Sequence, residues 1–175
     1  MKKAIYIFIF FISQYFFGQQ SNQLWKGYFS YNEIVDVESS TNAVFASTQN
    51  ALFSQAVASS NLNVYNSITG LKPDVITTIH HSDAFNKTFV GNNNGLILIQ
   101  NADGSVTTKV DVIEEVPVPP NKKRINDFFE FNGRLYIATD YGISVIDIAT
   151  SEFISTYFIG TSGEETEVLQ TTVFN

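Results

Sequence analysis

The chain has 175 residues, of which 44% are hydrophobic, 14% are aromatic and only 15% are charged. This composition is typical of an all-β protein and does not fit an intrinsically disordered chain. The formal net charge of −7 argues against nucleic-acid binding, which needs a basic surface. The absence of cysteine excludes disulfides, thiolate metal sites and cysteine catalysis.

The N-terminus has the pattern of a secretory signal peptide. Lys2 and Lys3 form a positive n-region, a mostly apolar stretch follows over residues 4–17, and Gly18 offers a small residue for cleavage. An apolar stretch of about 14 residues is shorter than the roughly 20 that a membrane-spanning helix needs. We therefore predict a signal peptide at residues 1–18 and a protein exported to the periplasm or cell surface. Since no cysteine is present to carry a lipid, we expect it to associate with the outer membrane only through partners.

One pattern occurs three times in the rest of the chain. An aromatic residue, a strand end of small residues, a polar turn and an apolar residue follow one another at 45–52, 89–96 and 136–143. These copies are 44 and 47 residues apart. A period in the forties that consists of short strands is a β-propeller signature.

Each repeat contains four segments rich in β-branched and aromatic residues, which we interpret as the four antiparallel strands of one propeller blade. The predicted strands are 34–37, 43–48, 52–55 and 62–68 in the first repeat, 76–79, 87–91, 96–100 and 106–113 in the second, and 125–128, 133–139, 143–148 and 153–159 in the third.

The predicted fold class is therefore all-β, a β-propeller with three four-stranded blades plus the first strand of a fourth. The blades are expected at about 31–70, 74–116 and 124–160, and the start of the fourth at 166–175. Propellers have about four to eight blades, so we expect an incomplete ring, with residues 19–175 forming the N-terminal part of a larger propeller. The connector at 114–124 is expected to be extended rather than helical, because it is rich in proline.

Several polar–glycine pairs predict tight turns, since glycine readily adopts positive φ. They are Asn94-Gly95, Asp103-Gly104, Asn132-Gly133 and Tyr141-Gly142. Blade one has Ala51 where the other blades have glycine. Its turn must therefore be built differently, or Asn50 must adopt the strained conformation.

His80, His81 and Asp83 form the only cluster of metal-ligand residue types in the sequence. Neighbouring residues of a strand point to opposite faces, so both imidazoles cannot converge on one ion without a kink. We favour a solvated or capping role for them over a metal site.

Asp36 and Asp127 occupy the same position of the repeat, where blade two has Thr78. First strands line the channel of a propeller, so these side chains could surround a ligand or cation. The alternative, which we favour, is that they are small polar residues that line a water-filled channel or hydrogen-bond neighbouring blades, because acid–base catalysis needs a second, differently tuned group within reach. We predict no catalytic, cofactor-binding or metal-binding residue, and no enzyme.

Lys122, Lys123 and Arg124 are the only run of positive charge after residue 18. Clustered Lys and Arg suit an anionic polymer, which makes these three residues weak candidates for ligand binding. The alternative is a solvated loop whose charge Glu114 and Glu115 balance, and isolated surface charges usually contribute little.

A family resemblance rests on the order of the segments. These are residues 25–31, 34–37, 45–52, 69–71 followed by 75–79, 125–127 followed by 135–143, and 157–160 after the third blade. With the leader and the entry containing Trp25, this order resembles the PorZ-like components of the type IX secretion system, within the broader regulator-propeller repeat superfamily. The resemblance covers essentially all of the chain after the leader.

The resemblance implies a non-catalytic scaffold or ligand-presenting accessory of the sortase attachment complex, at the outer membrane. It implies the sortase PorU with PorV and PorQ as partners, anionic lipopolysaccharide as the ligand, and no cofactor. One alternative is the periplasmic carbohydrate-sensing propeller of a hybrid two-component receptor. Another is a polysaccharide-cleaving enzyme, which needs paired carboxylates from blades outside this sequence.

Overall fold

The computed structural model describes residues 31–116 and 118–173. The predicted signal peptide and Trp25 lie outside these residues. Within the described part of the chain, no helix is both long and apolar enough to cross a membrane.

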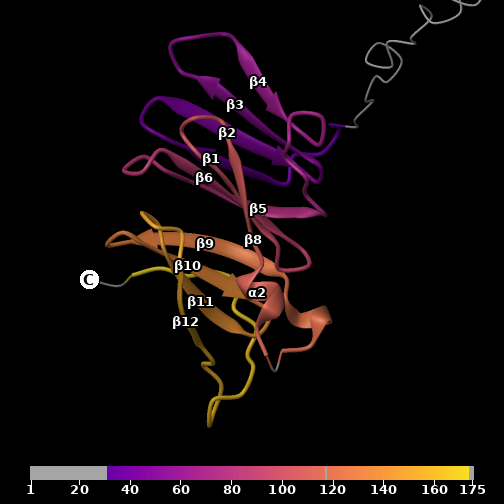
Figure 1. Cartoon of the computed structure of the whole chain (residues 1–175), viewed down its shortest axis with the longest axis vertical. Coiled ribbons are helices and arrows are strands. Elements are labelled where there is room, and N and C mark those ends of the chain that lie inside the picture. Colours follow the sequence, from indigo (N-terminus) through magenta and orange to yellow (C-terminus); the bar gives the residue numbers. More distant parts are fainter. Residues whose placement is uncertain (1–30, 117, 174–175) are drawn as a thin grey trace, which may run out of the picture.

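The described residues form three antiparallel sheets of four strands each, and within each sheet the strand order follows the chain (Figure 1). Blade one contains β1 (Asp36–Ser39), β2 (Ala43–Thr48), β3 (Ala51–Ala56) and β4 (Leu62–Tyr65). Blade two contains β5 (Ile76–Ser82), β6 (Lys87–Asn92), β7 (Ile97–Gln100) and β8 (Val106–Lys109). Blade three contains β9 (Ile125–Phe131), β10 (Arg134–Thr139), β11 (Gly142–Asp147) and β12 (Phe153–Tyr157). The predicted β-propeller with three four-stranded blades is confirmed, and the ring is open.

The blades pack face to face around their first strands. β5 lies between β1 and β9, so the innermost strands of the three blades are neighbours. Figure 1 shows blade one and blade three at the two ends of this arc, with blade two between them. Each blade therefore buries one face against the next, as blades of a propeller do.

Two apolar clusters fill the two junctions between blades. The cluster between blades one and two contains Phe45, Leu52, Leu71, Ile76, Ile79, Val90 and Leu98. The cluster between blades two and three contains Phe89, Ile97, Ile99, Val112, Val118, Ile125, Phe128, Leu135, Ile137, Tyr141, Ile146 and Ile148. The second junction thus has the larger apolar core.

The sequence prediction of a strand over 106–113 is wrong in its second half. β8 ends at Lys109, and Asp111–Glu114 form the short helix α2. The helical turn places the fully buried Val112 in the core between blades two and three. The connector is also not wholly extended, because Pro120–Lys122 form a 3-10 helix with proline in its first turn, where the fixed φ of proline fits.

Residues 166–173 lie against blade three without forming a strand. The Val168 amide donates to the Thr139 carbonyl at 2.9 Å, as the Ile76 amide of blade two donates to the Gln49 carbonyl of blade one at 2.9 Å. The segment therefore packs against blade three much as the start of β5 packs against blade one. Among the described residues no second strand lies beside it, so the ladder that defines a strand is missing.

The predicted turn at Asn132-Gly133 has positive φ at both residues, 51° and 74°, as a two-residue hairpin turn requires. Gly142 is required for another reason, since a Cβ there would lie 2.3 Å from the Tyr157 carbonyl oxygen. In blade one the turn is built differently. Asn50 is not among the described residues with positive φ, and its side-chain oxygen accepts from the Thr48 hydroxyl at 3.2 Å.

Candidate functional site

The two aspartates of the repeat accept hydrogen bonds from the segment of chain that packs against their own blade. One carboxylate oxygen of Asp36 accepts from both the Thr78 hydroxyl and the Ile79 amide, each at 2.9 Å. The Asp127 carboxylate accepts in the same way from the Thr171 amide at 3.1 Å. Burial raises the pKa of Asp127 above its ordinary value, although this hydrogen bond acts in the opposite direction. Asp36 therefore joins β1 to β5, and Asp127 joins β9 to the segment 166–173 that lies against blade three.

His80 connects all three blades. Its Nδ1 lies 3.1 Å from Glu38 of β1, and its Nε2 lies 3.2 Å from Glu130 of β9. Burial is the largest influence on this imidazole and lowers its pKa, but the hydrogen bonds and charges of the two glutamates together outweigh burial. The net result is a raised pKa, so the bridge favours the protonated ring.

His81 points to the opposite face of β5, as the sequence predicted. Its ring stacks on Phe45 with centroids 4.2 Å apart, and its Nδ1 lies 2.9 Å from the Thr88 hydroxyl. Burial lowers its pKa, although Asp83, whose carboxylate lies 3.7 Å from Nε2, opposes this shift. The described residues contain no group of three or more His, Cys, Asp or Glu side chains that could hold a metal ion.

The basic run is divided among three environments. Lys123 is 6% exposed, and its ammonium donates to the carbonyls of Ile113 and Glu115. Lys122 forms an ion pair with Glu165 at 2.8 Å, and Arg124 is exposed and donates to Asn126. The three side chains therefore do not form one cationic surface.

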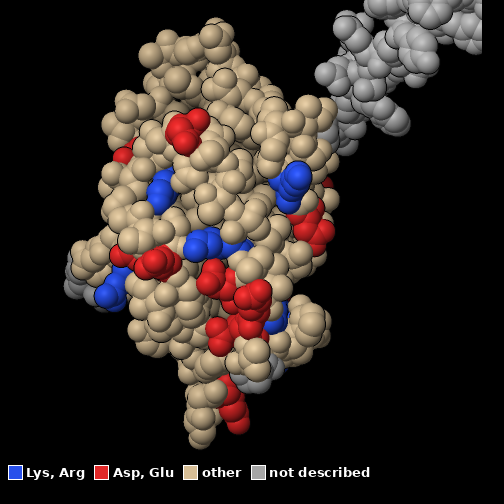
Figure 2. Space-filling model, in the orientation of Figure 1, with Lys and Arg blue, Asp and Glu red and all other residues tan. Residues whose placement is uncertain are grey.

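The surroundings of Lys122 are also acidic. A shallow hollow beside it is lined by Asp140, Glu165 and Glu167. On the face shown in Figure 2, most acidic side chains gather in the lower half of the molecule, and Lys and Arg are scattered singly over the whole face. This face offers no continuous basic patch to an anionic polymer.

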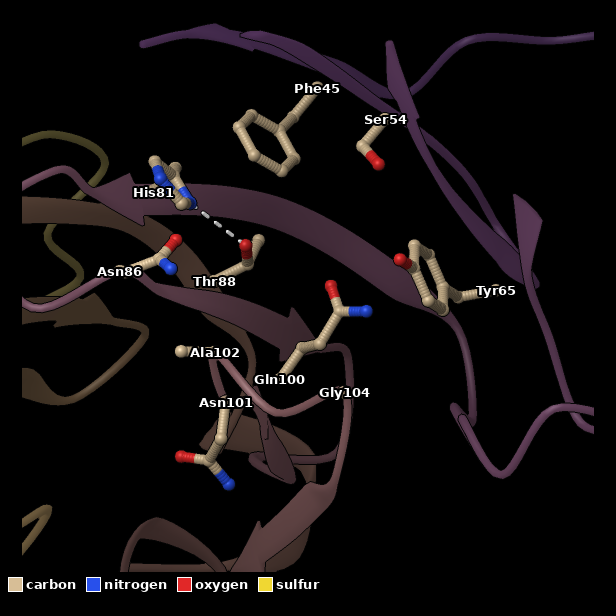
Figure 3. Close-up of a pocket in the computed structure, with 10 residues that line it drawn as sticks. All are labelled: Phe45, Ser54, Tyr65, His81, Asn86, Thr88, Gln100, Asn101, Ala102 and Gly104. Carbon is tan, nitrogen blue, oxygen red and sulfur yellow. Dashed lines mark hydrogen bonds between the residues drawn. The ribbon is translucent and has the colours of Figure 1, made fainter. Parts of the chain in front are cut away.

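A polar cavity of about 180 Å³ lies in the groove between blades one and two (Figure 3). It is lined by Phe45, Ser54, Tyr65, His81, Asn86, Thr88, Gln100, Asn101, Ala102 and Gly104. None of these residues is Asp, Glu, Lys or Arg. The sequence analysis missed this cavity because its walls come from two blades. The available signal was the polar Gln100 at the end of an otherwise apolar strand.

The comparisons with known proteins agree with this geometry. The family described as type IX secretion system PorZ, N-terminal β-propeller domain, matches residues 44–175. The chain belongs to this family. The sequence prediction of a PorZ-like N-terminal propeller is thus confirmed. No curated protein sequence matches the chain.

Solved structures show the same fold at low sequence identity. PorZ, a surface component of the type IX secretion system of Porphyromonas gingivalis, superposes with a TM-score of 0.68 and 21% identity. The extracellular domain of a putative hybrid two-component system from B. thetaiotaomicron gives 0.56 and 19%, and the WD40 repeats of RRP9 give 0.59 and 15%. The matches cover 76%, 70% and 75% of this chain, but only 18%, 16% and 40% of those chains, respectively.

Proposed function

We propose that this chain is a non-catalytic propeller domain of an exported accessory of the type IX secretion system. The observation that carries the proposal is the match to the PorZ N-terminal propeller family over residues 44–175. The structure supports a scaffold role, because the prominent carboxylates and His80 are engaged in contacts between blades rather than aimed together at a substrate.

The finer proposal is that the whole protein acts at the cell surface, associated with the outer membrane through partners. It serves there as a scaffold or ligand-presenting subunit of the attachment complex with the sortase PorU, PorV and PorQ, and it handles anionic lipopolysaccharide. Lys122 and Arg124 are the exposed members of the basic run, but the acidic neighbours of Lys122 disfavour it as an anion contact. We therefore expect the lipopolysaccharide contacts to lie outside the described residues.

Deletion of the gene in its host tests this proposal. We expect secreted cargo proteins to keep their C-terminal signal domains and to be released unattached, and complementation with the intact gene should restore processing. Normal cleavage and surface attachment of cargo in the deletion strain would contradict the proposal. If deletion instead abolished only the transcriptional response to a carbohydrate, the alternative hypothesis of a carbohydrate-sensing two-component receptor would replace this proposal.

A further inference from the structure

The groove between blades one and two is lined by a side-chain amide that has no hydrogen-bond partner within the described residues. Gln100, the last residue of β7, is 8% exposed, and its side chain forms no hydrogen bond within the described residues. Figure 3 shows its amide pointing into the cavity, on the side of Ser54 and Tyr65 of blade one. The adjacent Asn101 differs, because its amide donates to the hydroxyls of Ser105 and Thr107. The amide atoms of Gln100 are open to the cavity, so a hydroxyl group that enters the groove can take the place of water as their hydrogen-bond partner.

The strand registers show that this polarity is specific to one junction. Cross-strand partners share a face of a sheet, so Thr88 and Gln100 of blade two face blade one together. The corresponding cross-strand pair of blade three, which faces blade two, is Leu135 and Ile146.

The wall of the groove that blade one provides shows the same difference between the two junctions. Ser54 pairs with Phe45 in blade one, and at the corresponding position of blade two Ile99 pairs with Phe89. Thus three polar residues of the first junction correspond to three apolar residues of the second, namely Ile99, Leu135 and Ile146, which are all at most 1% exposed. The repeat can fill this space with apolar side chains, and between blades one and two it does not.

The chemistry of the lining selects a neutral, hydroxyl-rich ligand. The Gln100 amide provides donors and an acceptor, and the Tyr65 hydroxyl has no hydrogen-bond partner within the described residues. Ser54 and Thr88 add hydroxyl groups, while the Tyr65 ring adds apolar surface. The lining contains no Asp, Glu, Lys or Arg, and burial lowers the pKa of its one imidazole, His81, which favours the neutral ring. An ionic ligand would therefore be desolvated without a counter-charge.

The size of the cavity limits the ligand further. Its volume of about 180 Å³ is below the roughly 300–1,000 Å³ typical of pockets for drug-sized ligands. We propose that this groove binds one neutral monosaccharide unit, with Gln100 and Tyr65 as its main hydrogen-bonding residues. This inference goes beyond the proposed function, because it concerns a neutral ligand in a single groove and makes no use of the secretion partners.

Saturation-transfer NMR and calorimetry on the full-length protein test the proposal. The probes are the methyl α- and β-glycosides of glucose, galactose, mannose and N-acetylglucosamine, with glucuronate and inorganic phosphate as anionic probes. We expect at least one neutral glycoside to bind with millimolar affinity. A neutral trisaccharide that ends in the same sugar distinguishes a glycan terminus from a free sugar, since only an accessible terminal unit lets it bind equally well.

Two variants and one control connect binding to the groove. Gln100→Ala should weaken binding of the neutral probe by about tenfold, and Tyr65→Phe, which removes only a hydroxyl group, by several-fold. The matched control is Gln55→Ala, because Gln55 is an exposed strand glutamine that does not line the cavity. Equal melting temperatures of Tyr65→Phe and the parent protein show that a loss of binding is not a loss of folding.

The outcomes separate cleanly. Binding of a neutral glycoside that falls in both groove variants and persists in Gln55→Ala supports the proposal. The proposal is overturned if no neutral glycoside binds, if binding persists in Gln100→Ala, or if the anionic probes bind as tightly as the neutral ones. None of these results depends on the phenotype of the gene deletion, so this inference and the proposed function can fail separately.

Discussion

The two junctions between blades come from one repeat, and they differ in what fills them. Between blades two and three, apolar side chains of both blades meet, and the connector adds the buried Val112 and Val118. Between blades one and two the apolar cluster is smaller, the connector adds only Leu71, and a polar cavity remains beside it. The difference shows that the repeat specifies the strands and the recurring apolar residues of the first strand. The individual residues on the faces where two blades meet decide whether a junction is filled or leaves a cavity for a ligand.

Exchanging polar residues into the closed junction gives the largest expected effect. The double variant Leu135→Thr and Ile146→Gln copies the Thr88–Gln100 pair into a site where both residues are fully buried. Lost apolar burial and an unpaired amide should lower the free energy of unfolding by about 4 kcal/mol or more. Hydrogen exchange at the amides of β6 and β10 measures this loss.

The control for that experiment is Val44→Thr. Val44 lies on the outer face of blade one and is 45% exposed, so its replacement should leave hydrogen exchange nearly unchanged. If the double variant exchanged no faster than Val44→Thr, the second junction would not be the better packed of the two.

The connector gives the next effect. Lys123→Met leaves the carbonyls of Ile113 and Glu115 without their donor, and we expect a loss of about 2 kcal/mol. Lys122→Met is the matched control, since it breaks an ion pair whose lysine is 46% exposed, and it should cost less than about 1 kcal/mol. Urea unfolding monitors both variants, and equal costs would show that the connector does not stabilise the second junction through Lys123.

An apolar residue in the junction between blades one and two should stabilise the protein, in contrast to the two preceding variants. Gln100→Ile places in blade two the residue type that blade three has at the same register position. Isoleucine buries apolar surface where the glutamine leaves a hydrated amide, which should raise the free energy of unfolding by about 1 kcal/mol. A lower melting temperature for this variant would indicate that the Gln100 amide is satisfied in the folded protein.

The recurring apolar residues of the first strand of each blade were predictable from the sequence. Which faces of the blades are covered by a neighbour was not. Ile76, Ile79 and Ile125 recur at repeat positions, and all three are buried. Val37 occupies an equivalent position but is 57% exposed, because no described blade covers that face. Burial of a repeat position thus depends on the neighbouring blade, which periodicity alone does not contain.

The candidate site shows the same limit. The opposite directions of His80 and His81 followed from strand alternation, but their partners on β1, β2 and β9 did not, since these residues are far apart in the chain. The burial of Lys123 was missed for a local reason. The carbonyls that accept from Lys123 belong to Ile113 in the helical turn α2 and to Glu115 directly after it. The sequence analysis interpreted the residues up to 113 as the end of a strand, so it did not place these carbonyls.

The two histidines provide the smallest effect and the most direct comparison of the junctions. The pKa of His80 is raised in the folded protein by Glu38 of β1 and Glu130 of β9, despite burial. Its contribution to stability is therefore complete below the unfolded value of 6.5 and is lost as the pH rises through the higher folded pKa. The pKa of His81 is lowered by burial, so its contribution is present above 6.5 and is lost as the pH falls through the lower folded pKa.

Replacing each histidine by glutamine should separate these opposite dependences. Melting temperatures of His80→Gln, His81→Gln and the parent protein are compared between pH 5 and pH 8 at constant ionic strength. Relative to the parent, His80→Gln should be most destabilised at the acid end, where the protonated bridge between Glu38 and Glu130 is fully formed. His81→Gln should be most destabilised at the alkaline end, because the parent ring is neutral there and stacks on Phe45. If the melting temperatures of the two variants instead changed in parallel with pH, His80 in the bridge between the blades and His81 in the groove would not differ in protonation. Gln100 and its neighbours alone would then account for the polar character of the groove.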